Sequence, residues 1–155
     1  MRHLAACLFA LLATSATAQT QPDYSDNRST PADVVTSLYN AINRHEYLRG
    51  YSYFRDGAIP DFQAFETGYQ DTDHVDLRMG EVTGDGAAGS YHSQVPVAIR
   101  AVDSAGRSTV YTGCYRLTQV QPAIQEVPPF RPIQIDEGHL AVSRQPFESA
   151  MGQCN

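Results

Sequence analysis

The chain has 155 residues, of which 17 are acidic and 11 are Arg, so its net charge at neutral pH is −6. A chain of this length is expected to form one domain, and its apolar content of 42% is sufficient for a folded core. Nucleic acids and anionic lipid surfaces bind clustered positive charge, so the acidic balance excludes both as expected partners.

The first 18 residues have the features of a secretory signal peptide. Arg2 precedes an apolar run over residues 4–13, and the small residues Ala16 and Ala18 occupy the two positions that a signal peptidase reads. We therefore expect cleavage after Ala18, no membrane span in the mature chain, and a periplasmic or extracellular bacterial protein. Residues 4–7 also fit a lipobox, but a lipoprotein signal has its apolar region before that motif and here it follows.

Cleavage would remove Cys7 and leave Cys114 and Cys154. In an oxidising compartment two cysteines allow one disulfide, which would join the end of the chain to the middle of the domain. The alternative is two unpaired thiols. We expect the disulfide, and we expect no metal site, because no Cys or His stands at ligand spacing from another.

The mature chain begins with a polar segment, residues 19–29, whose lack of periodicity predicts a flexible lead-in. The rest, residues 30–155, is expected to form the single domain. Its first helix begins at Thr30, because Thr is a favoured N-cap and Pro31 suits the first helical position. Five apolar residues then recur at helical spacing on one face: Val34, Val35, Leu38, Tyr39 and Ile42.

Two shorter helices are expected to follow. The first ends at the Asp56-Gly57 pair, and the second begins at the Pro60-Asp61 pair. Their apolar faces consist of Tyr47, Leu48, Tyr51 and Phe54 in the first and of Phe62, Phe65 and Tyr69 in the second.

The second half of the chain changes to the alternating period of β-strands. Four strands are expected, over residues 74–79, 91–102, 109–120 and 139–143, with a turn at Asp85-Gly86. Pro96 lacks the N–H that a sheet interior uses, so it predicts an edge position or a bulge. The Pro-rich residues 121–137 predict a long surface loop. Helices followed by an antiparallel sheet constitute an α+β fold.

This order of elements resembles the NTF2-like superfamily, which is also described as SnoaL-like or cystatin-like cone. Residues 34–47, with the sequence VVTSLYNAINRHEY, resemble the aromatic-containing first helix of that superfamily and the turn into its second helix. The superfamily also has this order of elements, three helices followed by about four curved antiparallel strands on which they pack. The resemblance implies a cone-shaped pocket, which members use for isomerisation, dehydration, cyclisation, ligand binding or packing alone, so the fold does not define an activity.

Four residues are candidates for the wall of that pocket: Tyr39, His92, Arg100 and Tyr111. Enzymes of the superfamily place a carboxylate or histidine with a tyrosine inside the cone, because proton transfer needs a base and an oxyanion needs a donor. His92 and Arg100 share one face of their strand with Gln94. That face supplies a base and a cation if it points into the cone. The valines on the opposite face favour an outward, solvated orientation instead.

The sequence contains no catalytic triad, nucleophile elbow, phosphate loop or dinucleotide fingerprint. We therefore expect an exported, non-catalytic protein that binds a small apolar or carbonyl ligand in an NTF2-like pocket without a cofactor. The alternative is an isomerase or dehydratase in which a histidine or aspartate base acts with Tyr39. A third hypothesis is an interaction protein that forms a homodimer through its sheet.

Overall fold

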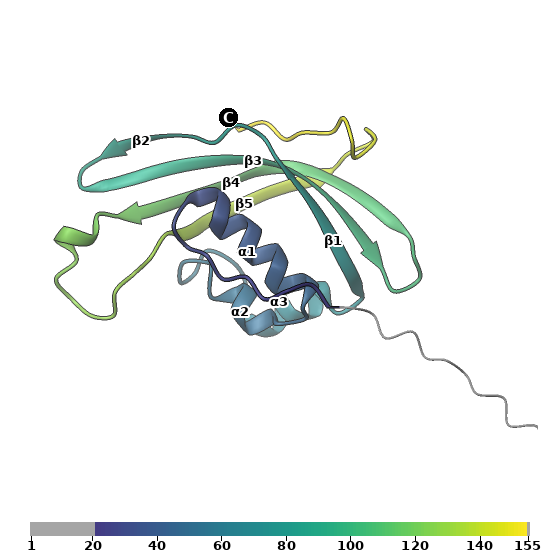
Figure 1. Cartoon of the computed structure of the whole chain (residues 1–155), viewed down its shortest axis with the longest axis horizontal. Coiled ribbons are helices and arrows are strands. Elements are labelled where there is room, and N and C mark those ends of the chain that lie inside the picture. Colours follow the sequence, from purple (N-terminus) through teal and green to yellow (C-terminus); the bar gives the residue numbers. More distant parts are fainter. Residues whose placement is uncertain (1–20, 155) are drawn as a thin grey trace, which may run out of the picture.

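The structure, a computed structural model, describes residues 21–154 as three helices on the concave side of one curved antiparallel sheet (Figure 1). The predicted signal peptide, residues 1–18, lies outside the described residues. No helix between residues 21 and 154 is both long and apolar enough to cross a membrane. The elements, in chain order, are α1 (Pro31–Asn43), α2 (Tyr47–Tyr51), α3 (Phe62–Tyr69), β1 (Thr72–Met79), β2 (Thr83–Ala87), β3 (Ser90–Asp103), β4 (Ser108–Val120), the 3-10 helix η1 (Pro122–Ile124) and β5 (Gln134–Val142).

α1 begins and packs as the sequence predicts. The Thr30 hydroxyl accepts the Asp33 N–H at 3.1 Å, and Pro31 occupies the first helical position. All five residues of the predicted apolar face are at most 2% exposed. They share one hydrophobic core with inward residues of the sheet, among them Val95, Val97, Ile99, Tyr115 and Leu117. Burial of each such side chain contributes about 1.5–3 kcal/mol, so α1 is the main support of the sheet.

α3 lies where it is predicted, whereas α2 ends at Tyr51, before the predicted break at Asp56-Gly57, so Phe54 lies outside it. One residue of α2 also faces the other way. Leu48, expected on the apolar side of α2, is 69% exposed. α2 is a single short turn that packs through the buried Gly50, which lies next to the Phe65 ring of α3. A helix of this length presents too few residues for the periodicity to define its buried side.

The sheet is organised around β3. β4 pairs with β3 along its whole length, from Ser90↔Val120 to Val102↔Ser108. On the other side of β3, β2 pairs with its first part and β1 with its last part, and β5 lies beyond β4. The fifth strand, β2, was not predicted, because the Asp85-Gly86 pair lies within it. The turn comes later, at Ala88 and Gly89, whose φ angles of 48° and 79° suit a two-residue hairpin.

The prediction of an edge position or a bulge at Pro96 is wrong. Pro96 lies in the middle of β3 and pairs with Cys114 of β4 in an unbroken register. On its other side the pairing of β2 ends at Gln94 and that of β1 begins at Val97, so Pro96 faces the gap between two strands. Its missing N–H therefore removes no ladder hydrogen bond, while its carbonyl accepts the Gly80 N–H at 2.8 Å.

The last strand is longer than predicted and begins earlier. β5 starts at Gln134, so the surface loop ends well before residue 137. The backbone after α2 borders β5 through one parallel bridge, between Phe54 and Ile135. The Ile135 N–H donates to the Tyr53 carbonyl at 2.8 Å, and the Arg55 N–H donates to the Ile135 carbonyl at 2.9 Å. The prolines of residues 121–137 led to the prediction of a loop where β5 begins, although Ile133 and Ile135 are packed in the core.

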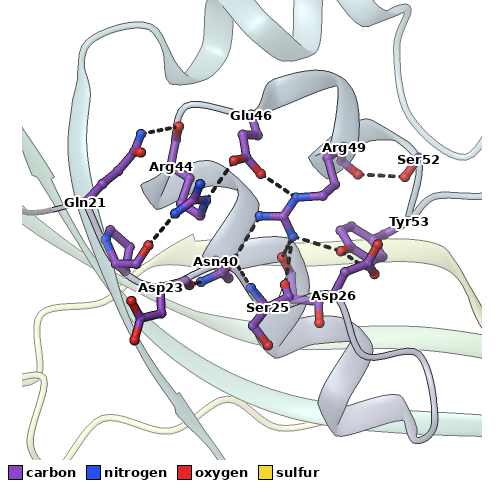
Figure 2. A network of polar contacts seen from close by, with 12 residues as sticks. Gln21, Asp23, Ser25, Asp26, Asn40, Arg44, Glu46, Arg49, Ser52 and Tyr53 are labelled. Carbon is purple, nitrogen blue, oxygen red and sulfur yellow. Dashed lines mark hydrogen bonds and ion pairs between the residues drawn. The ribbon is translucent and has the colours of Figure 1, made fainter.

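The segment before α1 differs from the predicted flexible lead-in over the residues that the structure describes. Residues 21–30 run along α1 and α2, held by side chains of both helices (Figure 2). Arg49 donates to the Ser25 carbonyl at 2.8 Å. The Asn40 amide donates to the Asp23 carbonyl at 2.8 Å and accepts the Ser25 N–H at 3.0 Å. Such side-chain contacts to a distant backbone have no local pattern that could predict them.

The C-terminal tail, residues 143–154, lies on the outer face of the sheet, the face away from the helices (Figure 1). The predicted disulfide between Cys114 and Cys154 is confirmed and anchors the tail to β4. Arg78 of β1 also donates to the tail carbonyls of Phe147 and Ala150, at 2.6 and 3.0 Å. The tail therefore covers part of the outer face.

Candidate functional site

A cavity of about 470 Å³ lies between α3 and the concave face of the sheet. Its helical wall includes Phe65 and Tyr69 of α3 and Tyr39 of α1, and its sheet wall includes Ile99, Tyr111, Tyr115 and Leu140. The described residues that line it include no aspartate, glutamate, histidine or arginine. The cavity is thus an apolar and aromatic space in which tyrosine hydroxyls are the main polar groups.

The cavity exists because α3 stands away from the sheet. α3 is capped by Asp61, whose carboxylate accepts the Ala64 N–H at 3.0 Å, and each of its eight residues is at least partly exposed. Its Phe65 ring packs on Tyr51 and Phe54, with centroids 5.7 and 5.9 Å apart. These contacts attach α3 to α2 and to the segment after it, and they leave the space toward β3 and β4 open. The exposed Ala64 and Gly68 line the mouth of the cavity.

Tyr39 and Tyr115 form a buried hydroxyl pair in the wall of the cavity. Their oxygens lie 2.7 Å apart, and their rings pack edge to face with centroids 6.3 Å apart. Burial raises the pKa of both hydroxyls well above the usual value near 10, so both stay protonated at neutral pH. Only one of the two O–H groups is needed for their mutual bond, which leaves the other able to donate to a ligand.

Tyr69 adds a third hydroxyl. Burial, with a smaller contribution from the neighbouring Tyr111, raises the pKa of Tyr69 to about 12. A tyrosine with such a pKa donates a hydrogen bond at neutral pH but does not act as a base. The described lining can therefore hold an apolar body and hydrogen-bond an acceptor atom, whereas it offers no group suited to abstract a proton.

The structure separates the four predicted pocket residues into two pairs. Tyr39 and Tyr111 line the cavity, but His92 and Arg100 do not. The cavity therefore does not bring all four together. Alternate residues of a strand point to opposite faces, and the inward positions of β3 belong to its valines, which is the orientation that the sequence pattern favours. Arg100 instead pairs with Asp76 on the outer face, at 2.7 Å.

The sequence missed the two residues that most affect the chemistry of the cavity. Tyr115 is buried in the core, and its bond to Tyr39 joins residues 76 positions apart. Tyr69 was expected to face inward from α3, and no periodicity reveals that α3 leaves a space before it. The one signal in the sequence that could have indicated these residues was the presence of tyrosines on the inward faces of separate elements.

Replacing Tyr115 with Phe is expected to lower the free energy of unfolding by about 1–3 kcal/mol, because the buried Tyr39 hydroxyl loses its partner. Tyr39→Phe is expected to cost a similar amount. The double variant should lose clearly less than the sum, since no unpaired hydroxyl then remains. Urea unfolding of the four proteins measures the coupling, and strictly additive losses would contradict a direct bond between the two hydroxyls.

No protein-family model and no curated protein sequence matches the chain. Among solved structures it is similar to a candidate aromatic ring hydroxylase from Novosphingobium aromaticivorans, with a TM-score of 0.50, 12% identity, and coverage of 72% of this chain and 90% of that one. It is also similar to a candidate dehydratase of the NTF2-like family from Streptomyces avermitilis, with a TM-score of 0.48, 10% identity, and coverage of 72% and 93%. Likeness at these identities concerns the fold alone. The likeness to the first of these, together with three helices on the concave side of a curved antiparallel sheet, shows that the chain has the α+β fold that the sequence resemblance implies.

Proposed function

We propose that the protein binds a small, mainly apolar or aromatic ligand that carries a carbonyl or similar acceptor, and that it does not transform this ligand. The observation that carries the proposal is the lining of the cone cavity, in which aromatic and aliphatic side chains surround protonated tyrosine hydroxyls. Its volume of about 470 Å³ is within the usual range of small-molecule sites. The apolar walls would bind the body of the ligand, and a tyrosine O–H would bind its acceptor.

The alternative, an isomerase or dehydratase, has less support. Such an enzyme needs a base within hydrogen-bond reach of the substrate proton. His92, the histidine considered for that role, is on the opposite side of the sheet from the cavity. The hydroxyl pair of Tyr39 and Tyr115 could stabilise an oxyanion, but an oxyanion donor alone does not move a proton.

We also propose that the protein functions outside the cytoplasm, in the periplasm or beyond the cell. The support is the signal-peptide pattern of residues 1–18 together with a disulfide, because disulfides persist mainly in oxidising compartments. The homodimer expected from the sequence remains a prediction, and any contact through the outer face would have to accommodate the tail.

The test combines native mass spectrometry of protein recovered from a periplasm with calorimetric titration of aromatic ketones, such as acetophenone. Gly68→Phe should weaken binding of the ketone by about tenfold, because the new ring occupies the mouth of the cavity. Thr67→Phe is the matched control: the same ring on the neighbouring exposed residue of α3, which does not line the cavity, should change affinity by less than about twofold.

Two results would contradict the proposal. Equal affinity of Gly68→Phe and Thr67→Phe would mean that the ketone binds elsewhere. Conversion of the bound compound, detected as a changed mass that requires intact protein, would contradict the non-catalytic part and favour the enzyme instead. A retained mass in the protein from the periplasm, absent from Gly68→Phe, would support the proposal and begin to identify the ligand.

A further inference from the structure

A second hollow, of about 290 Å³, lies at the end of the sheet where Ser90 of β3 pairs with Val120 of β4. Its basic residues come from three separate segments: Arg55 follows α2, His92 belongs to β3, and Arg131 belongs to the loop before β5. Thr118 and Gln134 add a hydroxyl and an amide. His92, Thr118 and Gln134 occupy paired register positions across β3, β4 and β5, so they share the outer face, opposite the cone cavity.

Asp136 organises two of these groups. Its Oδ1 lies 2.9 Å from Arg55 Nη2, and its Oδ2 accepts the Thr118 hydroxyl at 2.6 Å. Thr118 Oγ1 in turn lies 2.9 Å from His92 Nδ1. Because the single proton of Thr118 is donated to the carboxylate, Thr118 must accept the Nδ1–H of His92. This chain of hydrogen bonds orients the imidazole and leaves Nε2 as the ring nitrogen that it does not use.

The charge of Arg131 has no counterpart in this cluster. Asp136 balances Arg55, whereas no carboxylate within residues 21–154 pairs with the exposed Arg131 side chain. Its backbone is nevertheless held in place, because Gln125 accepts the Arg131 N–H at 2.8 Å and donates to the Arg131 carbonyl at 2.9 Å. Gln125 also donates to the Val120 carbonyl at 3.0 Å, which attaches this part of the loop to β4.

We propose that this hollow binds a small oxyanion, either a carboxylate or a phosphate or sulfate group. Two arginines, a histidine and a glutamine line it, and guanidinium groups match planar and tetrahedral oxyanions with paired N–H donors. The residues that line the hollow include two arginines and no aspartate or glutamate, although Asp136 pairs with Arg55 and Asp85 lies across from His92 in the β2–β3 pair. The site is independent of the cone cavity and of the ligand proposed for it.

The test is titration of the intact protein with inorganic phosphate, sulfate or succinate, followed by NMR of the histidine imidazoles and by calorimetry. We expect the His92 resonances to shift. Arg131→Gln should weaken binding by about tenfold through loss of a charged hydrogen bond, and His92→Gln should weaken it as well. Arg107→Gln removes an exposed arginine at the opposite end of β3 and β4, about 40 Å away along the strands, and should change affinity by less than about twofold.

A loss of oxyanion affinity in Arg131→Gln and His92→Gln that Arg107→Gln does not show, with unchanged melting temperatures, supports the site. Binding of phosphate and sulfate without succinate would identify a tetrahedral oxyanion, and the reverse would identify a carboxylate. Absence of binding by all three at about 10 mM, enough to detect a Kd on the order of 1 mM, overturns the proposal. Equal weakening by Arg107→Gln overturns it too, because the effect would then be general electrostatics. Acetophenone should not compete with phosphate, so this test and that of the cone cavity fail separately.

Discussion

Reduction of the Cys114–Cys154 disulfide is expected to lower the free energy of unfolding by about 4 kcal/mol. The two cysteines are 40 positions apart, and a cross-link across a loop of that length removes much conformational freedom from the unfolded chain. Since domains of this size have a total stability of about 5–15 kcal/mol, the loss is a large share of it. Urea unfolding with and without a reductant measures the difference.

The double variant Cys114→Ser/Cys154→Ser provides the control. It should have the stability of the reduced protein, and the reductant should not change it further. Hydrogen exchange should also become faster at the Gly152 N–H, which donates to the Val97 carbonyl at 3.1 Å in the oxidised protein. A loss of less than about 1 kcal/mol would mean that the contacts of Arg78 and Gly152 hold the tail without the disulfide.

Replacing Arg49 with Met is expected to lower the free energy of unfolding by about 3 kcal/mol. Arg49 is 12% exposed and lies at the centre of the network in Figure 2. It donates to Glu46 at 2.6 Å, to Asn40 and the Ser25 carbonyl at 2.8 Å each, and to the Tyr53 hydroxyl at 3.1 Å. Met keeps most of the apolar volume but removes every donor, so several part-buried acceptors lose their partner.

The same substitution should release residues 21–30 from α1 and α2. Hydrogen exchange or limited proteolysis of this segment, alongside urea unfolding, separates local release from global destabilisation. Arg107→Met is the matched control, because Arg107 is 82% exposed and pairs only within its own hairpin, where little change in stability is expected. Equal effects of the two variants would contradict a special role of Arg49. Arg49→Lys should not restore stability, since Lys lacks the planar fork that reaches several acceptors together.

Predictions from the sequence succeeded where structure depends on neighbouring residues. Thr30 and Pro31 define the start of α1, the helical spacing of five apolar residues defines its buried face, and alternation identifies most of β1, β3 and β4. Tyr39 and Tyr111, which were named for the pocket that the family resemblance implies, line the cavity. The disulfide followed from counting cysteines, because two remaining cysteines allow one pairing.

The features that only the tertiary structure decided depend on contacts between distant segments. Pro96 is tolerated inside β3 because two other strands leave a gap beside it. The hydrogen bonds that hold residues 21–30 against α1 and α2 can form only when these two helices are packed together. The bond between Tyr39 and Tyr115 needs a helix to meet a strand, and the cavity needs α3 to stand away from the sheet.

The sequence by itself therefore determined most of the elements, the apolar face of α1 and the disulfide of this protein, since each follows from spacing or cysteine count along the chain. The tertiary structure alone decided which polar residues share a space. It separated His92 and Arg100 from the cone and brought His92 together with Arg55 and Arg131. The physical reason is that a strand or helix defines only the direction of each side chain relative to its neighbours, whereas the group that it meets depends on how the whole chain packs.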